Sequence, residues 1–175
     1  KLRLDAPDVN NSEFKFTVND EGRIVYGLGA IKGVGEGPVE AITEARQAGP
    51  FKDLFDFCER IDLKRVNKRT LGGLISSGAL DRLGPFFYDE PKQYQANIDR
   101  NRGVLLAALE EAIQSAEQTA RSHDSGHADL FGGLFVEPDA DVYANHRGAK
   151  EVTLKERLRG EKETLGLYLT GHPID

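Results

Sequence analysis

The sequence contains no methionine and only one cysteine, Cys58. A lone cysteine excludes an internal disulfide and fits a reducing cytosol. Because Cys58 lies in the apolar run LFDFC, we expect it at the core position of a helix rather than as a reactive thiol. A primary translation product begins with methionine, whereas this chain begins with lysine. We therefore expect the 175 residues to be a piece of a longer protein, whose catalytic residues need not lie within it.

Long apolar runs are also absent. No stretch approaches the roughly 20 apolar residues that a membrane span requires, and the polar start KLRLDAPDVNN is unlike a signal peptide. Charged residues make up 30% of the chain, and its mean hydropathy is -0.47. These values predict a water-soluble, cytoplasmic protein without a membrane partner. The length suffices for one core and leaves room for an appendage.

The chain has no overall excess of positive charge, since its formal net charge is -6. This value argues against nonspecific nucleic-acid binding by the whole surface. The charge is uneven, however: residues 23–84 contain ten basic and eight acidic residues, whereas residues 85–175 contain ten and sixteen. Within the first of these regions lies a short basic run of Lys64, Arg65, Lys68 and Arg69. Such a run is either the solvated face of a helix or a phosphate-binding patch.

The stretch 27–37 is the most glycine-rich of the chain, with five glycines in eleven residues. Gly33 and Gly35 permit positive φ angles and a close approach of the backbone to a partner. Gly37 suits a helix N-cap and Pro38 the first helical position, and apolar residues then recur at helical spacing. The stretch thus predicts a short helix, a glycine hairpin and a second helix, whose N–H groups and dipole form an anion site. Such a helix-hairpin-helix pattern typically binds nucleic-acid phosphates without reading bases. The predicted phosphate-contacting residues are Lys32, Gly33, Val34, Gly35, Glu36 and Gly37, together with the basic run.

The alternatives for these glycines are a simple connection, a dinucleotide-binding loop and a P-loop. One alternative, which stays open, is that the stretch only connects two helices. A dinucleotide-binding fingerprint needs G-x-G-x-x-G after a strand, and a P-loop needs Gly-Lys followed by Ser or Thr. Neither pattern occurs, because Lys32 precedes its glycine and no Ser or Thr follows it.

The rest of the chain predicts a mainly α fold. Alternation over residues 13–28 predicts a β-hairpin, and Asp53 and Asn67 are placed to cap two helices. A second hairpin at Gly78 is degenerate, since it lacks Gly-x-Gly. We predict a tandem helix-hairpin-helix domain with a small N-terminal β-hairpin, a long helix and a C-terminal helix. The predicted boundaries are 1–28 for the strand pair, 29–84 for the tandem domain, 85–121 for an insert and the long helix from residue 99, 122–150 for a flexible linker, and 151–175 for the C-terminal segment, helical over 152–169.

The predicted linker contains one apolar pair, Leu130 and Phe131, after Asp129 and between glycines. An apolar pair in a polar loop has no evident core to join, so it predicts an anchor for a partner's pocket. The alternative is that the pair folds back onto this domain. His123 and His127 are four residues apart, but with glycines nearby and no cysteine we assign no metal site.

Several segments resemble the alpha subunits of bacterial DNA polymerase III, the C-family replicative polymerases. They occupy the first half of the chain and its last twenty or so residues, whereas residues 86–98 match the family pattern poorly and resemble a lineage insert. The matching segments are PDVNNSEFKF, YGLGAIKGVGEGPVEAI, FDFCERID, RVNKRTLGGLISSGALDRLG and EKETLGLYLTGHPID.

The resemblance implies a region that follows the polymerase palm and fingers. In that family a tandem helix-hairpin-helix domain holds duplex DNA behind the active site, and a linker then leads towards an oligonucleotide-binding fold. The parent would carry out DNA-templated 5'-3' DNA synthesis and would bind the other holoenzyme subunits. Its magnesium-binding palm aspartates are not in this chain, so we assign no catalytic residue and no cofactor here.

The family also carries an internal peptide that binds the sliding clamp, with the pattern Gln-x-Asp-Leu/Met-Phe. In this chain the corresponding residues, with histidine in place of glutamine, are His127, Ala128, Asp129, Leu130 and Phe131. The resemblance thus implies two partners, duplex DNA and the clamp. Two alternatives remain: the family's error-prone translesion paralogue, against which the clamp peptide argues, and a scaffold that never touches DNA.

Overall fold

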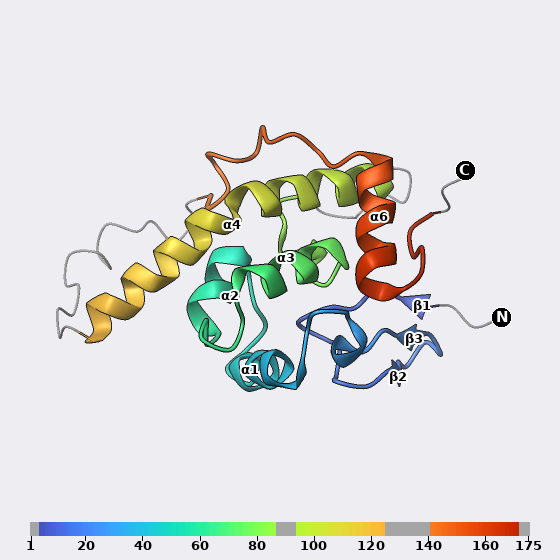
Figure 1. Cartoon of the computed structure of the whole chain (residues 1–175), viewed down its shortest axis with the longest axis horizontal. Coiled ribbons are helices and arrows are strands. Elements are labelled where there is room, and N and C mark those ends of the chain that lie inside the picture. Colours follow the sequence, from blue (N-terminus) through green and yellow to red (C-terminus); the bar gives the residue numbers. More distant parts are fainter. Residues whose placement is uncertain (1–3, 87–93, 125–140, 172–175) are drawn as a thin grey trace.

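The computed structural model describes residues 4–86, 94–124 and 141–171, and these are mainly helical, as predicted (Figure 1). A small sheet precedes the helices in the chain. In order, the elements are β1 (Leu4–Asp5), β2 (Thr17–Val18), β3 (Ile24–Val25), the 3-10 helix η1 (Leu28–Ala30), α1 (Glu36–Arg46), α2 (Leu54–Arg60), α3 (Lys68–Ser76), the 3-10 helix η2 (Asp81–Leu83), α4 (Tyr94–Asp124) and α6 (Leu154–Leu165).

The sheet has three strands in the order β1-β3-β2. The predicted hairpin is its antiparallel pair, in which Val18 lies opposite Ile24. The Asn19 side chain closes the turn by accepting from the backbone N–H of Arg23 at 3.0 Å, and Gly22 adopts a φ of 77°. The parallel strand β1 was not predicted, because two residues are too few to reveal a strand period.

Helix α1 begins earlier than the sequence predicted. Gly35, not Gly37, is its N-cap, with an extended backbone at φ -85° and ψ -176°. Pro38 therefore occupies the third helical position rather than the first. Within the hairpin, a left-handed backbone occurs only at Gly33, with φ 87°, so the tight turn lies there and Gly35 already leads into the helix.

The predicted caps of α2 and α3 are confirmed. The side chain of Asp53 accepts from the N–H of Asp56, and that of Asn67 accepts from the N–H of Thr70. Helix α6, by contrast, ends well before the predicted residue 169. Gly166 stops it in the left-handed conformation, with φ 78°.

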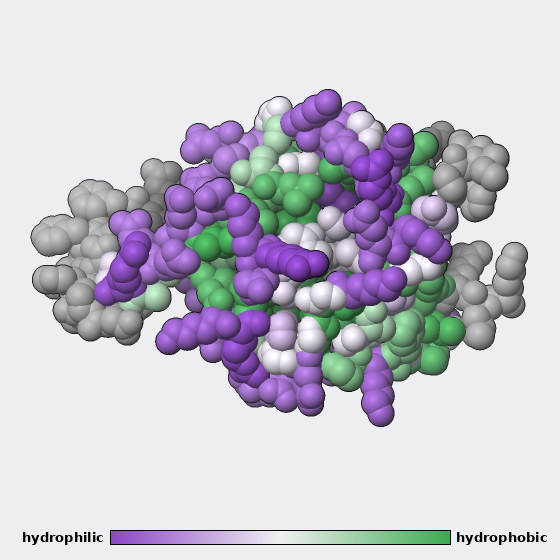
Figure 2. All heavy atoms as spheres, viewed as in Figure 1, coloured by the Kyte–Doolittle hydropathy of each residue, from purple (hydrophilic) through white to green (hydrophobic). Residues whose placement is uncertain are grey.

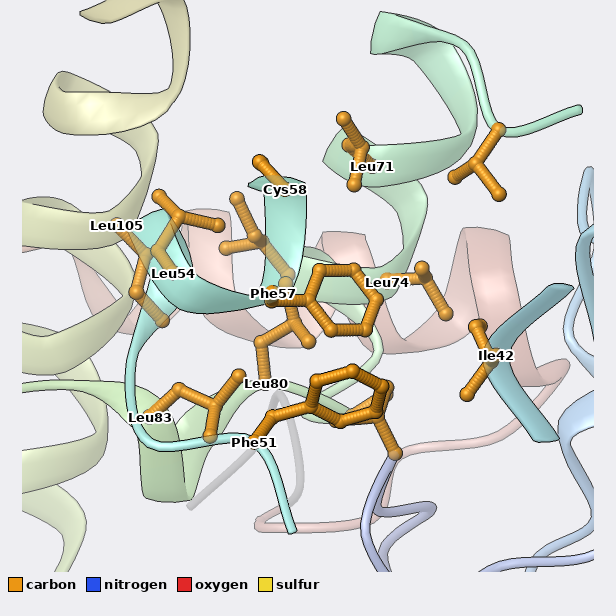
Figure 3. Close-up of a cluster of buried hydrophobic side chains, with 14 of the residues drawn as sticks. Ile42, Phe51, Leu54, Phe57, Cys58, Leu71, Leu74, Leu80, Leu83 and Leu105 are labelled. Carbon is orange, nitrogen blue, oxygen red and sulfur yellow. The ribbon is translucent and has the colours of Figure 1, made fainter. Parts of the chain in front are cut away.

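The hydrophobic core lies between α1, α2, α3 and the first half of α4 (Figure 3). The rings of Phe51 and Phe57 meet edge to face there, with their centroids 4.7 Å apart. Cys58 is buried among them, as predicted. Burial, with a smaller contribution from Asp53, raises the pKa of its thiol to about 12, so Cys58 serves as a packing residue.

Helix α4 is the longest element and starts before the predicted residue 99. It lies across α2 and α3, and its C-terminal part extends beyond them (Figure 1). At Gly103 the backbone of the returning chain comes very close, since a Cβ there would lie 2.4 Å from the Lys150 carbonyl oxygen. The described part of the predicted linker, 141–150, therefore packs against this helix instead of standing apart from it.

Candidate nucleic-acid interface

The hairpin between η1 and α1 carries backbone N–H groups that face no protein acceptor. Within the described residues, the N–H groups of Gly33, Gly35, Glu36 and Gly37 donate no hydrogen bond. The last three form the N-terminal end of α1, where the helix dipole is positive. A negatively charged oxygen at this end would meet several free donors, which is the geometry of an anion site.

The space in front of the hairpin is open. A Cβ placed on Gly33 or Gly37 would have no neighbour within 4 Å, and one on Gly35 would only reach the Pro38 ring at 4.0 Å. Val34, in contrast, points into the core and is 3% exposed, and its N–H is bonded to Ile31. Val34 thus anchors the hairpin, while the glycines leave its backbone accessible.

Two distant elements, α6 and α3, hold the hairpin from behind. The N–H of Lys32 donates to the Thr164 carbonyl of α6 at 2.8 Å. The Tyr26 hydroxyl donates to the neighbouring carbonyl of Leu165, also at 2.8 Å. From α3, the Thr70 hydroxyl donates to the Gly33 carbonyl at 3.3 Å. These bonds fix the orientation of the free N–H groups, and the sequence contained no signal for them.

The predicted basic run divides into two kinds of residue. Lys64 and Arg69 are exposed, and in the part of the chain that the structure describes they pair with no carboxylate. Arg69 directly precedes Thr70, which contacts the hairpin, so it flanks the anion site. Lys68 pairs with Glu110 at 3.2 Å, with side chains 62% and 69% exposed; so exposed a pair is weak and leaves Lys68 able to bind another anion.

Arg65 is more strongly engaged than the other three basic residues. Its guanidinium contacts Glu40 at 2.9 Å and Glu44 at 3.2 Å, both on the exposed side of α1. These pairs neutralise part of the acidic surface that α1 presents beside the hairpin. The structure therefore places Arg65 as a neutralising residue, and leaves Lys32, Lys64 and Arg69 as the unpaired cations of the predicted set in the described residues.

The second hairpin, at Gly78, is filled by protein. Gly78 adopts a φ of 92°, and a Cβ there would lie 2.7 Å from the guanidinium of Arg102. Arg102 is 2% exposed and donates to both carboxylate oxygens of Asp81, at 2.9 and 3.0 Å. The Arg102 guanidinium thus packs against Gly78, and the N–H groups of Gly78 and Ala79 already donate to the Ile75 and Leu74 carbonyls.

Arg102 also joins α4 to α6. Its guanidinium also donates to the carboxylate of the fully buried Glu161 at 3.0 Å. Glu161 in turn accepts from the N–H groups of Leu169 and Thr170. Burial raises the pKa of the Asp81 carboxyl, and Arg102 opposes that rise. The sequence analysis missed this cluster, named here the Arg102 cluster (Asp81, Arg102 and Glu161).

The structure does not bear on the predicted clamp peptide, because residues 127–131 lie outside the described residues. Further along the chain, the hydroxyl of the buried Tyr143 accepts from the Leu54 N–H at 2.7 Å and donates to the Leu83 carbonyl at 2.5 Å. Among the described residues no cluster of His, Cys, Asp or Glu is suited to hold a metal ion, magnesium included. None of the described helices combines the length and apolarity needed to span a membrane.

Comparison with known proteins gives two kinds of match. Residues 1–86 match the family model of the helix-hairpin-helix motif. The whole chain is 88% identical to a segment of the DNA polymerase III subunit alpha of Pseudomonas fluorescens and 78% identical to that of Pseudomonas aeruginosa. Over 99% of the chain, the identity to the subunit of Escherichia coli (strain K12) is 46%. The chain spans 15%, 15% and 14% of the length of these relatives.

Proposed function

Because this chain belongs to the family of DNA polymerase III alpha subunits, of whose length it spans about 15%, we propose that it is a noncatalytic module that binds the backbone of duplex DNA. The observation that carries the proposal is the row of free N–H groups at Gly35, Glu36 and Gly37, facing open space. Lys32 lies in the hairpin and Arg69 next to Thr70, which bonds to it; both cations are exposed and form no ion pair among the described residues.

These groups favour phosphate over bases as the ligand. A backbone N–H and a helix dipole both attract negative oxygen but carry no information about base identity. In the second hairpin the N–H groups of Gly78 and Ala79 donate to protein carbonyls, so among the described residues we assign the phosphate contact to the first hairpin. Binding is therefore expected to be weak, independent of sequence, and centred on a single phosphate site.

Replacing Gly35 with valine tests the backbone contact. The new side chain would enter open space within the fold but would block a phosphate from the N–H groups. Valine is a poorer N-cap than glycine, so we expect a stability loss of about 1 kcal/mol. Losing one hydrogen bond to a charged group should weaken duplex affinity about tenfold, measured by fluorescence anisotropy with a labelled duplex.

Gly148→Val is the matched control for this change. Gly148 also faces open space, but it lies in the turn region after residue 141, away from the hairpin. Its duplex affinity should equal that of the parent. If the folded Gly35→Val variant binds duplex as tightly as the parent, phosphate does not approach this hairpin.

Charge reversal tests the flanking cations. The double variant Lys64→Glu, Arg69→Glu removes two cations that pair with no carboxylate among the described residues. Each lost phosphate contact should lower the slope of log affinity against log salt by about 0.9. We therefore expect the slope to fall by about 2 if both residues contact phosphate. An unchanged slope, or a marked preference among duplex sequences, would count against this mode of binding.

The activity of the longer protein is part of the same proposal. The parent would extend DNA on a template, with magnesium held by the palm residues that the family resemblance places outside this chain. We further propose that residues 127–131 bind the sliding clamp through Leu130 and Phe131. This rests on the residue pattern Asp129-Leu130-Phe131, flanked by glycines.

Two rival functions are separable by experiment. The translesion paralogue is disfavoured by the clamp pattern and by relatives that all carry the name DNA polymerase III subunit alpha. A scaffold that never touches DNA would show no salt-dependent duplex binding at all. The salt titration therefore decides between a DNA-binding module and a scaffold.

A further inference from the structure

A groove runs along α6 on a part of the molecule that the hairpin does not use. Its volume is about 610 Å³. The exposed Leu154, 47% accessible, and Tyr168, 38% accessible, contribute apolar surface to it. These two side chains give the groove an apolar surface that is available to a ligand. The lining residues are Leu154, Lys155, Leu158, Arg159, Lys162, Glu163 and Tyr168.

The rim of the groove is positively charged. Lys155, Arg159 and Lys162 recur at helical spacing, so they form one ridge along α6, over about 10 Å of its axis. Against these three cations the lining has one carboxylate, Glu163. Lys155 and Arg159 form no ion pair within the described residues. Hydrophilic side chains gather over α6 in the view of Figure 2.

The aromatic residue lies directly beside this ridge. The Lys162 ammonium is 5.6 Å from the centre of the Tyr168 ring and bonds to the Gly166 carbonyl at 3.1 Å. Because Gly166 turns the chain in the left-handed conformation, Tyr168 comes back alongside the helix. The result is a row of cations next to an aromatic ring and two leucines.

We propose that this α6 groove binds single-stranded nucleic acid. A single strand presents a regular row of phosphates and, unlike a duplex, the flat faces of its bases. The row of phosphates matches the cations, and the base faces match the exposed side chains of Tyr168 and Leu154.

The groove is continuous with the duplex site through one element. The Thr164 carbonyl of α6 accepts from the Lys32 N–H of the hairpin, and residues between 154 and 163 of the same helix line the groove. A strand that leaves a duplex at the hairpin can therefore follow α6 without crossing the core. The proposal does not require that the hairpin bind duplex, and the tests below separate the two.

The first test reverses two charges of the ridge. Lys155→Glu with Arg159→Glu should weaken binding of a labelled oligothymidylate of about 12 nucleotides by about tenfold or more, measured by anisotropy with the 175-residue chain. The control pair Lys52→Glu, Arg121→Glu changes the net charge equally at exposed positions away from α6. Its affinity should stay within about twofold of the parent's, since distant charges are screened.

The second test concerns Tyr168. Tyr168→Ala should lose at least about fivefold in oligothymidylate affinity, the value of one stacked base, whereas Tyr168→Phe should retain it. Duplex affinity should be unchanged in all groove variants, and oligothymidylate affinity should be unchanged in Lys64→Glu, Arg69→Glu. If the unmodified chain binds oligothymidylate but not duplex, only the proposed function is refuted.

Three results would overturn the groove proposal. In the first, groove variants bind oligothymidylate like the parent. In the second, the control pair weakens binding as much as the ridge pair, which would mean that only overall charge matters. In the third, an acidic peptide rich in leucine and phenylalanine binds in a Tyr168-dependent way while oligothymidylate does not, which would make the occupant a protein.

Discussion

Arg102→Met should lower the free energy of unfolding by about 3–5 kcal/mol, the usual result of removing one member of a buried ion cluster. Without its guanidinium, Asp81 and Glu161 face each other in the interior with no counterion. Chemical denaturation followed by circular dichroism measures the loss. Arg82→Met is the control, because that side chain is 72% exposed and its removal should cost under about 1 kcal/mol.

The pH dependence of the variant gives a second, independent measurement. Burial raises the pKa of Asp81, and Arg102 opposes that rise, so the pKa rises further once Arg102 is gone. The folded variant then binds a proton that the unfolded chain releases, and its stability increases as the pH falls towards that pKa. The deficit against the parent should therefore be largest above neutral pH and should shrink in mild acid.

A triple variant in which the cluster is neutral provides a second test if Arg102→Met does not fold. Arg102→Met combined with Asp81→Asn and Glu161→Gln leaves no buried charge at this position, and replacing a whole buried cluster is often close to neutral. The triple variant should be more stable than the single one. If the single variant is as stable as Arg82→Met, the cluster does not hold α4, α6 and η2 together.

The double variant Leu130→Ala, Phe131→Ala should bind a bacterial sliding clamp at least about 30-fold more weakly, a loss of over about 2 kcal/mol. A short peptide must obtain most of its affinity from a few apolar anchors, because fixing its backbone costs free energy. Titration calorimetry with purified clamp measures the change. An affinity within about twofold of the parent's would mean that these two residues are not the anchor.

His127→Gln probes the one departure from the family pattern. A neutral imidazole offers one donor and one acceptor, whereas an amide offers more of each, so we expect glutamine to strengthen clamp binding. Duplex affinity should not change in any of the three substitutions, since they lie on a separate segment from the hairpin. A parallel loss of duplex affinity would indicate misfolding rather than a lost anchor.

The features that the sequence predicted correctly have local causes. Asp53 and Asn67 cap helices through N–H groups three residues away, and Cys58 sits in an apolar run that packs inward. The glycine hairpin was also recognisable, because its glycines are neighbours in the sequence. The exact N-cap was not, because Gly35 and Gly37 are both acceptable there, and only tertiary packing selects the first.

What the sequence could not reveal depends on contacts between distant residues. The bond from Tyr26 to Leu165 joins positions 139 residues apart, and no periodicity signals it. Arg102 stands in a helix rich in polar residues, so nothing distinguished it from a solvated arginine. Its partners Asp81 and Glu161 lie 21 and 59 positions away. The filled second hairpin was therefore visible only in three dimensions.

In the chain, helix α4 separates the hairpin proposed to bind duplex from the segment proposed to bind the clamp. Its 31 residues measure about 46 Å from end to end, and its outer part extends past the domain that carries the hairpin (Figure 1). Residues 127–131, proposed to bind the clamp, follow the end of this helix in the chain. A clamp bound to them and a duplex bound at the hairpin would each raise the local concentration of the other.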